Sequence, residues 1–224
     1  MPGLGARLGR GGATTFLQNL AESDCVVIMG ANMAENHPVG FRFVVQARER
    51  GATVIHVDPR YTRTSASSDI HIPIRAGSDI ALLGGLIQHV LATESFNREY
   101  VTHYTNATDI VGDDFHDTEE LEGRFSGLES AQSTYNPSTW KTTSAAVEDL
   151  EQALDDSRSV LSHLRRHFAR YTPQMVSSIC GSTEDQFQSM AEAIVRNSTA
   201  ERTTAFAYSV AWTQHTTGTQ MIAC

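Results

Sequence analysis

The stretch VVIMGANMAENHPVG, residues 26–40, decides the fold of this chain. Its first residues continue an apolar run that begins at Cys25 and stops at Gly30. A run of this length and composition is typical of a parallel strand that is covered on both faces. Small and polar residues follow, and Pro38 then indicates the start of a helix, because proline suits a first helical turn. We therefore predict a strand, a polar turn and a helix in immediate succession.

The residues that follow complete a βαβ unit over residues 25–58. Apolar residues recur at helical spacing up to Gly51, which is well placed to end the helix, and TVIHVD at residues 53–58 is a second strand. Downstream, IHIPIR at residues 70–75 predicts a short strand at a sheet edge or end, since its proline cannot donate to a strand ladder. TTAFAYSV at residues 203–210 predicts a third apolar strand. Strands that alternate with helices indicate an α/β fold with a doubly wound, mostly parallel sheet flanked by helices.

Several further segments have helical periodicity or helix-start signals. Helices are predicted at residues 14–23, 78–95, 97–105, 146–170, 173–180 and 182–198. Gly84 and Gly85, inside the second of these, permit close packing at some cost in helix propensity. Thr183 and Gln186 have the spacing of a capping box at the start of the last helix.

Residues 109–145 lose all periodicity and are acidic and rich in Ser, Thr, Gly and Asn. A solvated surface insertion is the expected interpretation, because charge runs are exposed in most proteins. A metal site built from these carboxylates is the alternative. We predict one domain over residues 1–224 that carries this stretch as a variable insertion, and a loop in the glycine-rich segment GLGARLGRGG at residues 3–12.

Composition excludes several classes of protein. The 224 residues are 40% hydrophobic, which allows a sizeable core, and the net charge of −9 with neutral histidines excludes a broadly electrostatic nucleic-acid binder. There is neither an apolar run of about 20 residues nor an apolar signal-peptide region. Cys25, Cys180 and Cys224 are isolated, so neither a zinc ribbon nor a local iron–sulfur cluster is supported. Cys25 is expected to be a buried, inert thiol.

Polar residues follow each apolar strand, and ligands of open parallel sheets bind beyond the carboxyl ends of the strands. The candidates are Gly30, Asn32 and Glu35 after the first strand, Asp58, Arg60 and Thr62 after the second, Gln214 and His215 after the third, and the backbone N–H groups and Asp79 of RAGSD at residues 75–79. A carboxylate suits a ribose diol or the edge of guanine, and an arginine or a helix N-terminus suits a phosphate. Together they predict a nucleotide-shaped ligand. A standard nicotinamide site is disfavoured, because no G-x-G-x-x-G follows the first strand.

Each candidate also has a purely structural interpretation. Asn32 and Glu35 could cap the helix at residues 39–51. Asp58 could make an Asx turn, and Arg60 could pair with Asp58 or with Asp69 at the surface. These interpretations remain open from the sequence alone.

Five segments, in this order, resemble the catalytic alpha subunit of respiratory, selenocysteine-type formate dehydrogenases, which are members of the molybdopterin oxidoreductase family. They are GRGGATTFLQNL (9–20), the long segment from VVIMGANMAENHPVG to ALLGGLI (26–87), FNREYVTHYTNA (96–107), RYTPQMVSSICGST (170–183) and YSVAWTQHTTGTQ (208–220). NMAENHPVG and the DPR-T-T pattern alone indicate only the wider family, nitrate reductases included. FNREYV and WTQHT-G point toward the formate enzymes.

The resemblance implies an incomplete molybdopterin-binding domain and a bis(molybdopterin guanine dinucleotide) cofactor holding molybdenum or tungsten. It also implies anaerobic oxidation of formate to carbon dioxide, an iron–sulfur beta subunit and a membrane cytochrome subunit as partners, and a place on the periplasmic side of the membrane. The cofactor-binding residues carried over by resemblance are Gly30, Asn32, Glu35, Asp58, Arg60, Thr62, Gly77, Asp79, Val210 and Gln214.

The chain also departs from the family pattern. The metal-ligating selenocysteine or cysteine is expected before GRGG, and the active-site arginine and the second guanine dinucleotide site after Gln220. The four-cysteine motif for a [4Fe-4S] cluster is absent as well, so no catalytic residue or metal ligand is assigned. We expect a central fragment that is inactive alone, whose start reflects a UGA selenocysteine codon read as a stop. The alternatives are a nitrate reductase-type fragment and a non-catalytic nucleotide-binding module.

Overall fold

The structure, a computed structural model, describes residues 3–5, 9 and 11–223. Of the glycine-rich segment that was predicted to be a loop, residues 6–8 and 10 lie outside the described residues. The prediction is wrong for residues 3–5, which are helical, whereas residues 9, 11 and 12 are in bends. The chain divides into two compact units, one formed by Met1–Ser95 with Tyr171–Cys224 and the other by Phe96–Arg170. Each unit is described by itself.

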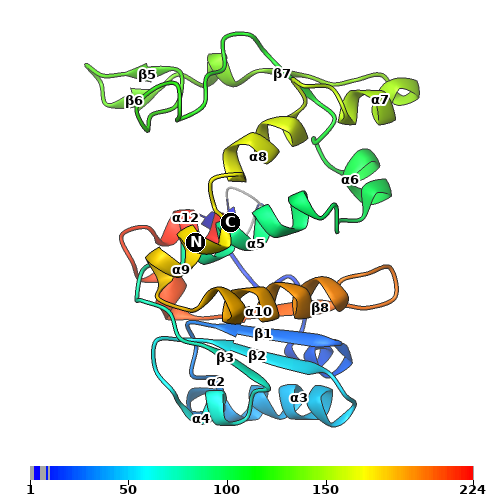
Figure 1. Cartoon of the computed structure of the whole chain (residues 1–224), viewed down its shortest axis with the longest axis vertical. Coiled ribbons are helices and arrows are strands. Elements are labelled where there is room, and N and C mark those ends of the chain that lie inside the picture. The colour runs from blue at the N-terminus through cyan, green and yellow to red at the C-terminus, as the bar shows by residue number, and fades with distance from the viewer. Residues whose placement is uncertain (1–2, 6–8, 10, 224) are drawn as a thin grey trace. The chain divides into compact units, whose positions relative to one another are not determined.

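The first unit contains a sheet of four parallel strands in the order β3-β2-β1-β8 (Figure 1). The strands are β1 (Cys25–Met29), β2 (Thr53–Val57), β3 (Ile70–Ile72) and β8 (Thr204–Tyr208). Both β2 and β8 pair with β1, in registers that place Thr53 and Thr204 beside Cys25. The predicted parallel sheet is confirmed, and β3 lies at an edge as Pro73 indicated. Because the chain moves to opposite sides of β1, the strand order reverses there, and such switch points are where ligands bind in open α/β sheets.

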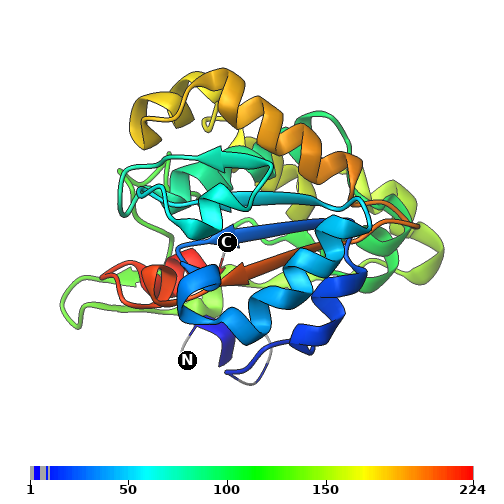
Figure 2. The same cartoon turned by 90° about the horizontal axis from the view of Figure 1, so that it is seen from below.

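Helices cover both faces of this sheet (Figure 2). They are α3 (Pro38–Glu49) and the 3-10 helix η1 (Leu17–Glu22) on one face, and α5 (Asp79–Ala92), α9 (Pro173–Cys180) and α10 (Glu184–Arg196) on the other. Alternate side chains of β1 point to opposite faces, as the period of a strand requires. Val26 and Ile28 therefore pack in one core, and Val27 and Met29 in the other. The doubly wound fold is confirmed.

The local signals around α3 are confirmed, and one neighbouring prediction is wrong. The helix begins at Pro38 and ends at Glu49, and Gly51 follows with a φ of +97°. The helix predicted over residues 14–23 is instead the six-residue 3-10 helix η1. A segment this short gains too few i→i−4 bonds to offset the cost of nucleating an α-helix.

Cys25 is completely buried at the start of β1. Burial raises the pKa of its thiol to about 11. A protonated thiol is a poor nucleophile, so the expected inert role agrees with this environment.

The capping box of α10 is present. The Thr183 hydroxyl accepts from the Gln186 N–H at 3.1 Å, and the Gln186 side chain accepts from the Thr183 N–H at 2.9 Å. We expect Thr183→Ala to lower the free energy of unfolding by about 1 kcal/mol, because the Gln186 N–H at the helix start loses its side-chain acceptor. Urea denaturation of the purified chain measures this change. Thr183→Ser keeps the hydroxyl and is the control; an equal loss in both variants would show that the cap contributes nothing.

The second unit consists of short elements. They are α6 (Arg98–Tyr104), β4 (Ile110–Val111), β5 (Leu128–Glu129), β6 (Thr134–Tyr135), η2 (Pro137–Trp140), β7 (Thr142–Thr143), η3 (Val147–Asp149), α7 (Leu150–Leu154) and α8 (Val160–Phe168). Part of its acidic run is paired within the unit, since Asp117 accepts from His167 Nδ1 at 3.0 Å and Glu119 pairs with Arg170. In the described part of the chain, no group of three or more His, Cys, Asp or Glu side chains is arranged to hold a metal ion. The alternative of a metal site among these carboxylates therefore has no structural support.

No helix among residues 3–5 and 11–223 has the length and apolar character needed to cross a membrane.

Candidate functional site

The loops after β1 and β8 meet at the switch point of the sheet. Gly30, the first residue after β1, has a φ of +57°, which favours glycine. A Cβ atom at Gly30 would lie 2.6 Å from the Cβ of Ala211, which belongs to the short helix α11 (Val210–Thr213) after β8. The Gly30 N–H donates to the Val57 carbonyl at the end of β2. Gly30 therefore lies where the ends of three strands meet, and its lack of a side chain allows the backbone to approach α11 closely.

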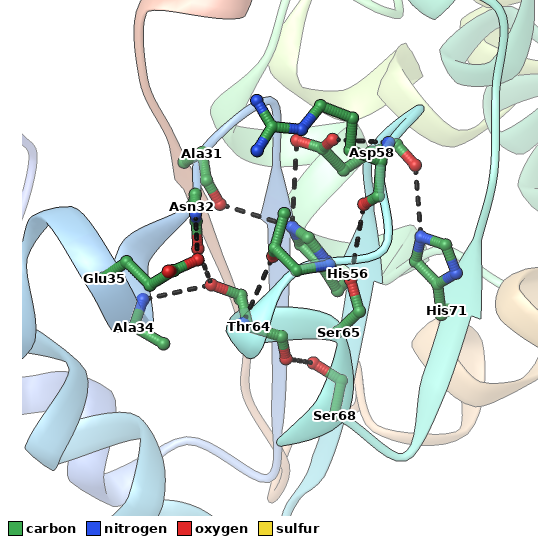
Figure 3. Close-up of polar contacts among 12 residues, drawn as sticks. Ala31, Asn32, Ala34, Glu35, His56, Asp58, Thr64, Ser65, Ser68 and His71 are labelled. Carbon is green, nitrogen blue, oxygen red and sulfur yellow. Dashed lines mark hydrogen bonds and ion pairs between the residues drawn. The ribbon is translucent and has the colours of Figure 1, made fainter.

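Asn32 and Glu35 lie at the short helix α2 (Met33–Asn36) and bind each other and α4 (Arg63–Ala66), the helix that follows β2. Asn32 Nδ2 donates to Glu35 Oε2 at 2.5 Å, and the Thr64 hydroxyl donates to Asn32 Oδ1 at 2.9 Å (Figure 3). Neither residue caps α3, whose N-cap is His37. The structural interpretation of Asn32 and Glu35 as caps of that helix is therefore wrong, because their polar atoms face α4 instead.

Glu35 is exposed at the surface, where it lies beside a cationic side chain. Its hydrogen bond from Asn32 lowers the pKa of the Glu35 carboxyl, and Arg63 lies 3.7 Å away. The carboxylate therefore stays charged around neutral pH.

The loop after β2 is held by local hydrogen bonds. Asp58 Oδ1 accepts from the Arg60 N–H at 2.8 Å, which is the Asx turn that the sequence allowed. Thr62 caps α4, since its hydroxyl accepts from the Thr64 N–H. The Ser65 hydroxyl accepts from the Thr62 N–H in return, which completes a capping box. The Asp58 carbonyl lies 3.1 Å from His71 Nε2.

The second carboxylate oxygen of Asp58 and the guanidinium of Arg60 take no part in those local hydrogen bonds. The second oxygen of Asp58 lies 3.9 Å from His56, and the Arg60 side chain is exposed. Asp69 pairs with Arg48 at 3.0 Å, so the suggested surface pair of Arg60 with Asp69 is wrong. The loop thus presents a carboxylate and a guanidinium two residues apart.

Asp79, at the start of α5, is buried against the loop after β8. Its Oδ1 accepts from the Trp212 indole N–H at 3.1 Å, and the Trp212 ring stacks on Tyr208. Burial is the largest influence and raises the pKa of Asp79; the indole bond and His215 oppose it, and the charge of Asp58 adds to it. Asp79 is therefore a buried carboxyl group that is held against the loop after β8 by the indole of Trp212.

The N-terminus of α5 has space in front of it. Gly77 has a φ of +85°, and a Cβ atom there would meet nothing within 4 Å. Ser78 is the N-cap by position, but its hydroxyl donates to the Arg75 carbonyl and accepts no capping hydrogen bond from the helix N–H groups. The positive end of the helix dipole therefore has no capping oxygen from Ser78 and suits an anion.

Two predicted residues lie at this edge because they follow β8 in the chain. Val210 and Gln214 are exposed, and the Gln214 N–H donates to the Val210 carbonyl at 2.8 Å within α11. Within the described residues, neither side chain is bonded to another predicted site residue.

Two hollows in the described residues have volumes of about 580 and 400 Å³. The larger lies in the second unit, and the smaller lies in the first unit beside β8, where His37, Phe206 and Ser209 are among its lining residues. Neither is lined by the predicted cofactor-binding residues. Their function therefore stays a prediction after the geometry is known.

Four residues that tie the site together were not singled out from the sequence. They are His56, Thr64, Ser65 and Trp212. A histidine at a buried position of a strand and a tryptophan in a polar turn were visible signals. Their partners were not visible, because they lie up to 133 positions away along the chain.

Comparisons with known proteins point to one family. The family model described as molybdopterin oxidoreductase matches residues 9–223. The nitrate-inducible formate dehydrogenase major subunit of Escherichia coli is 39% identical over 222 residues, which cover 98% of this chain and 22% of that protein. The formate dehydrogenase subunit alpha of Megalodesulfovibrio gigas is 38% identical over a match that covers 96% of this chain and 21% of that protein. Among solved structures, acetylene hydratase from Pelobacter acetylenicus has a similar fold, with a TM-score of 0.58, 17% identity, and 92% of this chain and 22% of that chain covered.

Proposed function

We propose that this chain, which belongs to the molybdopterin oxidoreductase family, binds one molybdopterin guanine dinucleotide within a formate dehydrogenase catalytic subunit. The observation that carries the proposal is the similarity, over 98% of the chain, to a protein named as a formate dehydrogenase major subunit. The chain spans about a fifth of that relative's length, because the match covers 22% of it.

The donor set at the carboxyl edge of the sheet fits the guanosine diphosphate end of such a cofactor. Asp58 supplies a carboxylate that can accept from the N1 and N2 groups of guanine or from a ribose diol. Arg60 and the N-terminus of α5 supply positive charge for two phosphates. A dinucleotide with a diphosphate would use the carboxylate and both positive groups. A ligand without phosphate would leave the two positive groups without a partner.

The remaining predicted residues take supporting roles in this proposal. Gly30 and Gly77 keep side-chain atoms away from the ligand's path, since neither position has a Cβ atom. Asn32, Glu35 and Thr62 shape the loops on either side, and Asp79 holds the indole of Trp212 against the loop after β8. Val210 and Gln214 lie near the pterin end of the cofactor in this proposal.

When bound, the pterin dinucleotide supplies the metal centre, molybdenum or tungsten, that receives two electrons as formate is oxidised to carbon dioxide. The part of this chain is to bind and orient that cofactor. We further propose that the whole protein passes electrons to a [4Fe-4S] cluster, an iron–sulfur beta subunit and a membrane cytochrome subunit on the periplasmic side, in anaerobic respiration.

Guanine nucleotide binding tests the proposal directly. We expect the purified chain to bind GDP in isothermal titration calorimetry and to bind ADP much more weakly, because only guanine offers two donors to Asp58. Asp58→Asn should weaken GDP binding about tenfold or more, as expected for loss of a charge-assisted hydrogen bond worth about 1.5–3 kcal/mol.

The matched control is Asp69→Asn, which removes a surface carboxylate that pairs with Arg48. It should leave GDP binding unchanged. Equal affinity for GDP and ADP would favour a non-catalytic nucleotide-binding module. Absence of GDP binding, together with no pterin released from chain expressed in a host that makes the cofactor, would overturn the proposal.

A further inference from the structure

His56 lies between the two loops that carry the proposed nucleotide site. It is on β2, is completely buried, and its ring nitrogens face opposite directions (Figure 3). Nδ1 lies 2.8 Å from the Ser65 hydroxyl in α4, and Nε2 lies 3.3 Å from the Ala31 carbonyl in the loop after β1. We infer that His56 is a positioning residue that, with its single ring proton on Nε2, fastens the loop after β1 to the start of α4.

The hydrogen bonds around Ser65 determine where the ring proton is. The Ser65 hydroxyl accepts from the Thr62 N–H at 2.8 Å, and it has one proton to donate. Donation to His56 Nδ1 at 2.8 Å is much shorter than donation to the Arg60 carbonyl at 3.4 Å. Nδ1 is then the acceptor, and the proton on Nε2 can be donated to the Ala31 carbonyl. The other tautomer would place a nitrogen lone pair against that carbonyl oxygen.

The surroundings keep this ring neutral. Burial is the largest influence and lowers the pKa of His56, while Asp58 opposes the shift and the neighbouring His71 adds to it. The Asp58 carboxylate is 3.9 Å from Nε2, and the two imidazole rings are 5.7 Å apart. The groups that face the ring from the loop after β1 and from α4, Ala31 and Ser65, do not titrate. A neutral His56 has one donor and one acceptor, which is what its two partners require.

The link matters because it sets the distance between two parts of the site. The loop after β1 carries Asn32 and Glu35, and the segment from β2 to α4 carries Asp58 and Arg60. Thr64 provides a second link, since it donates to Asn32 Oδ1 at 2.9 Å and accepts from the Ala34 N–H at 3.0 Å. This inference rests on the proposed function, because the geometry that His56 fixes is that of the proposed nucleotide site.

Three variants of the full chain separate positioning from mere packing. His56→Leu removes both bonds, and His56→Gln can keep the donor to the Ala31 carbonyl. His71→Leu is the control, because that imidazole binds the Asp58 carbonyl but neither Ala31 nor Ser65. Hydrogen exchange of residues 30–36 reports the order of the loop after β1, and calorimetry with GDP reports ligand affinity.

We expect His56→Leu to raise exchange in residues 30–36 at least tenfold and to weaken GDP binding by a similar factor. His56→Gln should recover part of both, and His71→Leu should leave exchange in residues 30–36 unchanged. The ¹⁵N shifts of the His56 ring should show a protonated Nε2 and a bare Nδ1 at pH 7. Protection unchanged in His56→Leu, or a proton found on Nδ1, would overturn the inference.

Stability against pH provides an independent measurement. An unfolded histidine takes up a proton near pH 6.5, whereas folded His56 resists protonation there. The unfolded state therefore binds more protons below pH 6.5, and stability should fall as the pH drops. The fall between pH 7.5 and pH 5 should be smaller in His56→Gln than in the original chain; equal falls would contradict a buried neutral ring.

The two proposals can fail separately. If the chain does not bind GDP, the proposed function fails, but hydrogen exchange, ring shifts and pH dependence still decide whether His56 fastens the loops. If GDP binds equally well to the original chain and to His56→Leu, the proposed function stands and the positioning role is wrong.

Discussion

Replacing Gly30 by alanine is expected to lower the free energy of unfolding by about 2–6 kcal/mol, the sum of two independent costs. The first is backbone strain, because the φ of +57° is unfavourable for a residue with a Cβ atom. The second is a clash, because that atom would lie 2.6 Å from the Cβ of Ala211 and 3.5 Å from Trp212 Cδ1. Neither neighbour is the flexible end of a long side chain, so the loops after β1 and β8 must separate.

Gly51→Ala separates these two costs. Gly51 has a φ of +97°, and nothing lies within 4 Å of an added Cβ atom. Gly51→Ala should therefore lower the free energy of unfolding only by the cost of backbone strain, about 1–3 kcal/mol. Urea denaturation gives both values, and fluorescence of Trp212 in a Trp140→Phe background reports opening at the switch point. Equal losses in the two alanine variants would show that the contact between Gly30 and Ala211 is not tight.

Phe187→Ala is expected to lower the free energy of unfolding by about 3–5 kcal/mol, because it leaves a large cavity in a closed core. Phe187 lies on α10 and is completely buried. Its ring approaches α5 where Gly85 has no side chain: a Cβ atom there would be 3.1 Å from Phe187 Cζ and 2.4 Å from Val176 Cγ2. The glycine of α5 thus makes room for the aromatic ring of α10.

Phe206→Ala is the matched control for that cavity. Phe206 is on the edge strand β8 and is 43% exposed, so its truncation removes less buried surface and leaves no enclosed space. Thermal or urea unfolding of the two variants should show a clearly larger loss for Phe187. Comparable losses would mean that the core between the sheet and α10 is loosely packed and can collapse around the gap.

Local signals predicted much of the fold. Pro38 and Gly51 marked the two ends of α3, and Thr183 with Gln186 marked the start of α10. These signals succeed because each acts within one or two helical turns, on groups that are neighbours in the chain. The failures have the same origin. Residues 14–23 have helical spacing, but length and packing, which spacing does not report, left only a short 3-10 helix there.

The candidate site was predictable in part. Because parallel strands end at one edge, Gly30, Asp58 and Asp79 could be assigned to that edge from the order of strands and helices alone. The hydrogen bonds that hold them could not be assigned. Asn32 could have capped a helix or bound a ligand, and only the position of Thr64, 32 residues later, shows where its side chain is bonded.

The sequence by itself determined the α/β class, the boundaries of its main strands and helices, and which polar residues follow each strand. It could do so because periodicity, caps and breakers depend on residues close together in the chain. Only the tertiary structure decided that Gly30 is packed against Ala211, that Asp79 is bonded to Trp212, and that His56 joins two loops. Those contacts form when distant segments pack, and side-chain shape and burial then select one partner among many that the sequence allows.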